Sequence, residues 1–122
     1  MARPGAMGLP YSDEEDMPNT AKIRKLNDEF RMTLIGGRTV MTRGIAARSD
    51  LQAIIEKVRT FHIFTDDNDP HGEHDFGAFE AGKDTVYWKL DYYDVSLSGG
   101  SPNPADPKVT IRVLTVMLAE EY

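Results

Sequence analysis

Cysteine is absent from this sequence of 122 residues, which excludes disulfide bonds, thiolate nucleophiles and metal sites held by cysteine. The chain also lacks any apolar run near the roughly 20 residues that a membrane-spanning helix needs. Its first residues contain no apolar core of a secretion signal. We therefore expect a cytoplasmic protein that does not contact a membrane.

Basic residues are scarce in the second half of the chain, and the formal net charge is -6. This balance argues against nucleic acid as a ligand of the whole surface, because phosphate binding requires a cationic field. Residues 22–59 nevertheless carry nine Lys/Arg against four Asp/Glu, whereas residues 60–122 carry four against twelve. The two segments either attract each other within one fold or form two patches with different partners.

The first 19 residues lack a periodic apolar face. They combine prolines and glycines with the acidic run Asp13–Asp16, a composition typical of disordered segments. We expect a flexible acidic tail over residues 1–19. Residues 20–122 are expected to form a single domain, since that length can bury a core of its own.

Two stretches have the spacing of amphipathic helices. The first follows Asn19 or Thr20, either of which can cap a helix, and is ended by the glycine pair at 36–37. The second contains Ser49 and Gln52 at the spacing of a capping box. The apolar positions at helical spacing are Ile23, Leu26, Phe30 and Leu34 in the first stretch, and Leu51, Ile54, Ile55, Val58 and Phe61 in the second.

Strand patterns occupy much of the remaining chain. "RTVMTRG" predicts a short strand closed by Gly44. Residues 76–94 predict a β-hairpin that turns at residues 81–84. The apolar positions that alternate along its second strand are Val86, Trp88, Leu90 and Tyr92.

The last segment, residues 107–122, is ambiguous. Asp106 and Pro107 have the residue types of a helix start, whereas the β-branched residues from Val109 to Val113 favour a strand. Of the two structures, we expect the helix. The predicted fold class is therefore α+β, with a small antiparallel sheet and a β-hairpin packed against two or three helices.

The interval between Arg59 and Lys83 contains no lysine or arginine, yet it holds all three histidines and six carboxylates. Such carboxylates repel one another unless a metal ion, a basic part of the fold or a partner lies among them. The spacing resembles a calcium loop, but His71 and Ala78 occupy positions that require oxygen ligands. His71, His74 and Asp75 offer nitrogen and oxygen ligands for a transition metal. The candidate metal ligands of the whole stretch are Asp67, Asp69, His74 and Asp75.

Two interpretations of this acidic stretch are open. In the first, "DDND" is a hydrogen-bonded turn, since Asp and Asn side chains bond to backbone amides in turns. In the second, the stretch is the site of a metal-dependent hydrolase or nuclease, with Glu73 as general base. The candidate catalytic residues are then Glu73, His74 and Asp75.

Four stretches together resemble one family: "IRKLNDEFR", "FTDDNDPHGEHDFGAFE", "VYWKLDYYD" and "SPNPADPKVTIRVLTVMLAEEY". From about Ile23 to Tyr122, the chain is similar to the bacterial domain of unknown function 3768 (DUF3768). The resemblance implies a compact single-domain bacterial protein with no known activity, cofactor or substrate. His71 stands where an aromatic residue is expected in relatives. A site common to the family would draw on Asp67, Asp69, Glu73, His74, Asp75, Asp91 and Asp94.

We expect a non-enzymatic accessory or protein-interaction module with an acidic face that suits a basic protein partner. The expected interaction surface comprises Asp67, Asp69, Tyr87, Asp91, Tyr93 and Asp94. Base stacking by the tyrosines is disfavoured, because single-strand binders surround their aromatic residues with basic ones. No cofactor is expected unless a divalent metal occupies the acidic stretch, and the metal-dependent hydrolase or nuclease is the alternative function.

Overall fold

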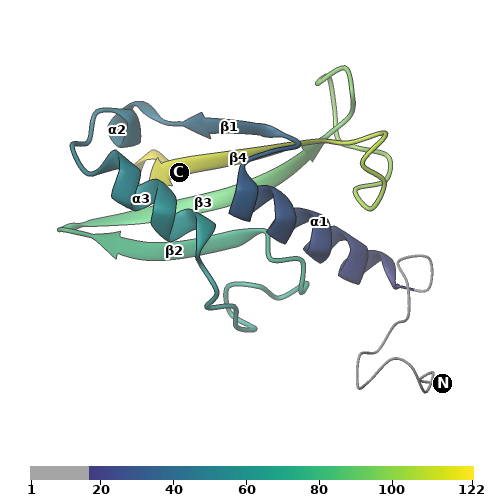
Figure 1. Ribbon diagram of the computed structural model, residues 1–122, viewed down its shortest axis with the longest axis horizontal. Helices are drawn as coiled ribbons and strands as arrows, with labels where there is room; N and C mark the ends of the chain where they lie inside the picture. Colours follow the sequence, from purple (N-terminus) through teal and green to yellow (C-terminus); the bar gives the residue numbers. More distant parts are fainter. Residues whose placement is uncertain (1–16) are drawn as a thin grey trace.

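The computed structural model describes residues 17–122, which form a sheet with helices packed on it (Figure 1). The strands are β1 (Arg38–Met41), β2 (Phe76–Ala81), β3 (Asp84–Tyr93) and β4 (Ile111–Leu118). The helices are α1 (Asn19–Thr33), α2 (Arg43–Ala46), α3 (Leu51–Arg59) and the 3-10 helix η3 (Ala119–Glu121). The predicted α+β class is confirmed. Residues 1–16 of the predicted tail lie outside the described residues.

The sheet is mixed rather than purely antiparallel. Its strand order is β1-β4-β3-β2, and β3 pairs antiparallel with both β2 and β4. Strand β1 pairs with β4 in parallel, with Arg38 opposite Val113 and Met41 opposite Val116. A parallel pair needs a long connection, which residues 42–110 supply. The strand order leaves β1 and β2 as the two edges of the sheet.

The core lies between the sheet and helices α1 and α3. Phe30 of α1 and Val58 of α3 pack in one cluster with Trp88 of β3 and Leu114 of β4. The predicted alternation along β3 is confirmed, because its buried residues are Val86, Trp88 and Leu90. The intervening side chains of β3 lie on the opposite face of the sheet.

The helix expected over residues 107–122 is wrong. Residues 111–118 form strand β4, in which Arg112, Leu114 and Val116 are buried. Asp106 serves a turn instead of a helix start, since its Oδ1 accepts the backbone N–H of Lys108 at 2.9 Å. The β-branched residues thus follow their strand preference once β3 and β1 flank them.

Both predicted amphipathic helices are confirmed, but their ends differ from the prediction. Pro18 precedes α1, so neither residue 19 nor 20 caps it, and Leu34 follows its last turn with a left-handed φ of 59°. The glycine pair lies beyond this stop. Asp50 precedes α3 without a side-chain cap bond, so the predicted capping box of Ser49 is wrong.

The predicted strand β1 is confirmed. Glu121 of the C-terminal turn η3 binds residues that follow the last residue of β1. The Thr42 hydroxyl donates to Glu121 Oε1 at 2.6 Å, and the Gly44 N–H donates to Oε2 at 2.9 Å. These bonds hold the pKa of the Glu121 carboxyl below its usual range. Gly44 lies inside α2 rather than closing the strand. The two bonds to Glu121 connect the chain after β1 to the turn that follows β4.

Candidate functional site

The acidic stretch forms a hydrogen-bonded loop between α3 and β2. Asn68 Oδ1 accepts the Thr65 N–H at 2.8 Å, and Asn68 Nδ2 donates to the Ile63 carbonyl at 2.8 Å. Asp69 is buried and its Oδ1 accepts the His74 N–H at 3.0 Å. These side-chain bonds to the backbone confirm the turn interpretation, whereas the neighbouring Asp67 is exposed.

His74 is held against the first helix. Its Nδ1 lies 2.9 Å and 3.1 Å from the two carboxylate oxygens of Asp28, and its Nε2 lies 3.7 Å from Asp69 Oδ2. Its ring stacks on Phe64, with centroids 3.7 Å apart and planes 5° apart. The left-handed φ of 55° at His74 places the ring at this position. The imidazole therefore joins the acidic loop to α1.

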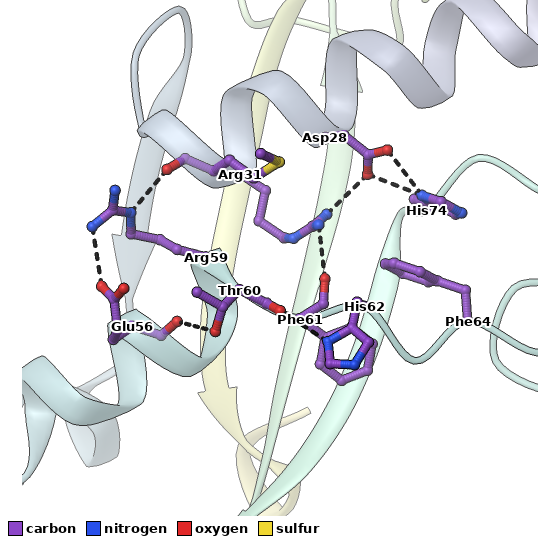
Figure 2. Close-up of a pocket in the computed structure, with 10 residues that line it drawn as sticks. Asp28, Arg31, Glu56, Arg59, Thr60, Phe61, His62, Phe64 and His74 are labelled. Carbon is purple, nitrogen blue, oxygen red and sulfur yellow. Dashed lines mark hydrogen bonds and ion pairs between the residues drawn. The ribbon is translucent and has the colours of Figure 1, made fainter.

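Arg31 completes the join between α1 and the segment after α3. Its Nε donates to the Val58 carbonyl at 3.1 Å, and its Nη2 donates to the Phe61 carbonyl at 3.0 Å. Its Nη1 pairs with Asp28 Oδ1 at 3.2 Å, so Asp28 lies between Arg31 and His74 (Figure 2). The guanidinium also lies over the Trp88 ring, 5.0 Å from its centroid. A charge so buried is held by carbonyls and a carboxylate as well as by the aromatic face.

An open hollow of about 500 Å³ lies beside this cluster (Figure 2). Polar groups at its rim bind one another: Arg59 donates to the Met32 carbonyl at 2.9 Å and to Glu56 at 3.1 Å. We call it the His74 hollow. Its lining consists of Asp28, Arg31, Met32, Glu56, Arg59, Thr60, Phe61, His62, Phe64 and His74.

Glu73 belongs to a different, buried network. Tyr92 donates its hydroxyl proton to Glu73 Oε1 at 2.7 Å, while Asn27 Nδ2 donates to the Tyr92 oxygen at 2.8 Å and to the Glu73 carbonyl at 3.0 Å. Arg112 donates from Nε to Asn27 Oδ1 at 2.8 Å and from Nη2 to the Pro104 carbonyl. Burial, followed by the bond to Glu73, raises the pKa of Tyr92.

The three candidate catalytic residues thus have three separate environments. Glu73 faces Tyr92, and His74 faces Asp28 and Asp69. Asp75 is half-buried, and its carbonyl accepts the Leu90 N–H at 2.9 Å. Over residues 17–122, no group of three or more His, Asp or Glu side chains is arranged to hold a metal ion.

We expect Asp75→Asn to raise the free energy of unfolding at neutral pH. Burial, followed by the charge of Glu73, raises the pKa of the Asp75 carboxyl, so the folded chain holds this proton more tightly than the unfolded chain. The stability from that proton is full below the unfolded pKa and is lost as the pH rises through the folded pKa. Urea unfolding from about pH 4 to pH 7 should show a growing advantage of the variant. A difference independent of pH would contradict the assignment.

The residues of the predicted interaction surface come from two parts of the fold, and Tyr93 lies on the same face of β3 as Tyr87 and Asp91. Tyr87 and Asp91 share the face of β3 opposite the helices, where Asp91 pairs with Lys89 at 3.1 Å. Asp94 holds the following loop, accepting the Ser98 N–H at 3.0 Å. Asp67 and Asp69 lie in the loop after α3, and only the former is exposed.

Exposed apolar residues are concentrated instead at and just before β1. Of the nine exposed large apolar residues in the described chain, four fall within residues 32–41, and we call this set the β1 patch. They are Met32, Ile35, Val40 and Met41, with exposed fractions of 53%, 79%, 46% and 38%. Val40 and Met41 are neighbours in the strand and therefore lie on opposite faces of the sheet. The periodicity of the sequence did not reveal this patch. The one available indication was Ile35, an apolar residue that does not belong to the set at helical spacing in the first helix.

A groove of about 370 Å³ runs beside the patch, between β1 and α3. Its apolar lining comes from Met41 of β1 and from Leu51 and Ile55 of α3. Glu56 and Arg59 line both this groove and the His74 hollow, so the two depressions adjoin. We call it the β1–α3 groove. An edge strand beside a helix-lined groove can receive an extended polypeptide.

The fold defines a small α+β domain with a mixed four-stranded sheet whose edges are β1 and β2. The chain belongs to the family described as protein of unknown function (DUF3768), whose sequence model matches residues 39–121. No curated protein and no solved structure matches the chain. Among residues 17–122, no helix has the length and apolar character needed to cross a membrane.

Proposed function

We propose that this protein is a non-enzymatic interaction module that binds an extended segment of a partner protein by adding it as a strand to β1. The observation that carries the proposal is the β1 patch on an edge strand beside the β1–α3 groove. Strand addition gives affinity through backbone hydrogen bonds, and alternate side chains of the added segment supply specificity.

The outward backbone groups of β1 follow from its pairing with β4. Thr42 N–H donates to the Val116 carbonyl at 3.1 Å, so Thr42 points its backbone groups toward β4. Because these groups alternate along a strand, Val40 shares that direction, whereas Thr39 and Met41 point away from β4. Two residues of β1 can therefore bond to an added strand without disturbing the sheet.

The opposite edge of the sheet is guarded. Lys57 donates from Nζ to the outward Glu80 carbonyl of β2 at 3.1 Å. Arg48 donates from Nη2 at 3.1 Å to the carbonyl of Ala81, which ends β2 opposite Asp84. Cationic side chains over an edge are a common protection against unwanted strand pairing. The contrast favours β1 as the binding edge.

The earlier expectations of function stay predictions beside this proposal. The acidic loop lies away from β1 in Figure 1, so a basic partner at Asp67 would use another surface. A metal-dependent hydrolase at His74 would need groups that the described chain holds in separate environments. Neither expectation accounts for the β1 patch.

The test is a proline substitution at each edge. Full-length protein is used to select peptides from a random display library, and the selected peptides are titrated against Thr39→Pro and Ala78→Pro. Thr39→Pro removes an outward N–H and should weaken binding about fivefold or more, since one hydrogen bond contributes about 1 kcal/mol.

Ala78→Pro is the matched control at the other edge. Ala78 shares the outward direction of Glu80 on β2, so this proline also spares the pairing within the sheet. Peptides should bind Ala78→Pro as they bind the unchanged chain. Equal binding to both proline variants, or the selection of no peptide, would overturn strand addition at β1.

A further inference from the structure

The charges beside β1 indicate which segment it receives. Arg38 begins β1, and Arg43 follows its end by two residues. Both are exposed, and within residues 17–122 neither makes an ion pair or a hydrogen bond through its side chain.

The other arginines of the described chain all have partners. Arg24 and Arg112 bind carbonyls, and Arg48 binds Asp50 and Asp84. Arg31 and Arg59 each bind a carboxylate and a backbone carbonyl. The unpaired arginines of residues 17–122 are thus confined to the two ends of β1, in a chain with a net charge of -6.

We propose that the β1 edge receives an extended partner segment with a carboxylate side chain at each end of an alternating apolar core. This inference rests on the proposed function. Arg38 and Arg43 are five residues apart, a span of about 17 Å in an extended chain. A segment with acidic residues about five positions apart therefore matches both arginines, while its alternate apolar side chains enter the β1–α3 groove.

Charge also disfavours a second copy of this chain as the occupant. When two copies of β1 pair antiparallel, the start of each strand lies beside the end of the other. Arg38 of each copy would then approach Arg43 of its neighbour. Like charges placed together across an interface oppose association, whereas a partner with carboxylates at both ends relieves them.

The test uses full-length protein and two fluorescent synthetic peptides. Both have the same core of alternating valine and threonine, and one ends in glutamates where the other ends in lysines. The acidic peptide should bind about tenfold more tightly at low salt, because exposed ion pairs contribute modestly and add at two sites. The difference should shrink as ionic strength rises.

Charge reversal identifies the residues. The variant Arg38→Glu with Arg43→Glu should bind the basic peptide more tightly than the acidic one. The matched control is Lys83→Glu with Lys108→Glu, which makes the same change in net charge at exposed sites outside β1 and should leave the preference unchanged. Thermal unfolding of each variant establishes that it is folded.

The outcomes separate the two proposals. Equal binding of both peptides, lost in Thr39→Pro, would overturn the acidic partner and leave strand addition standing. Binding of neither peptide, together with no peptide selected from the random library, would overturn both proposals. Dimerisation of the unchanged chain that Thr39→Pro abolishes would overturn the acidic partner and make a second copy the occupant.

Discussion

Replacement of Asn27 by leucine is expected to lower the free energy of unfolding by about 3 kcal/mol, because it leaves the Nε–H of the buried Arg112 without its acceptor, although Nη2 keeps the Pro104 carbonyl. Asn27 is fully buried, and its Oδ1 accepts the Nε–H of Arg112. Leucine has the same number of side-chain heavy atoms but cannot accept this bond, nor can it donate to Tyr92 and Glu73. Burial already lowers the pKa of Arg112, which indicates that its charge is costly at this position. Urea unfolding followed by fluorescence measures the loss.

Tyr92→Phe is the graded control within the same network. This change removes one hydroxyl that donates to Glu73 and accepts from Asn27, and it should cost about 1–2 kcal/mol. The aromatic face over which Arg112 lies is retained. If Asn27→Leu lowers the free energy of unfolding no more than Tyr92→Phe does, the bond between Arg112 and Asn27 contributes little to the stability of this network.

The sequence predicts those parts of the fold that local patterns determine. The helices α1 and α3 and the β2–β3 hairpin follow from apolar spacing, since each buries one periodic face. Strand β4 contradicts the prediction because Asp106 and Pro107 serve a turn, while pairing with two neighbouring strands sets the structure after them. Such pairing is a tertiary effect that no local window contains.

The candidate site was predictable only in its residue types. A polar turn around Asn68 follows from the sequence, but the partner of His74 is Asp28, 46 residues earlier. The network of Arg112 likewise joins residues 85 positions apart. The β1 patch was missed because a strand of four residues shows too little alternation to reveal which side is exposed.

Substitution of Gly77 by alanine is expected to cost about 2–3 kcal/mol, because the new methyl group overlaps the core tryptophan. A Cβ at Gly77 would lie 2.4 Å from Trp88 Nε1 and 2.6 Å from Trp88 Cε2. Trp88 is fully buried and forms edge contacts with Phe61 and Phe64, so its indole has little room to move. Thermal and urea unfolding measure the loss. Gly99→Ala is the control, since its nearest contact would be 3.8 Å away, and it should change stability by less than about 0.5 kcal/mol.

A second substitution tests whether the clash is with the indole itself. Trp88→Phe removes the ring atoms nearest to Gly77, together with the indole N–H, which has no hydrogen-bond partner within residues 17–122. The double variant should therefore be more stable than the sum of the two single losses predicts, with a coupling of about 1 kcal/mol or more. Additive losses would mean that the backbone of β2, rather than the indole, resists the methyl group.

The same tryptophan also supports the His74 hollow, because Phe61 and Phe64 line the hollow and contact the indole. A shift of the indole in Gly77→Ala should therefore change the NMR chemical shifts of His74, whose ring stacks on Phe64. The chemical shifts of β1 should stay unchanged.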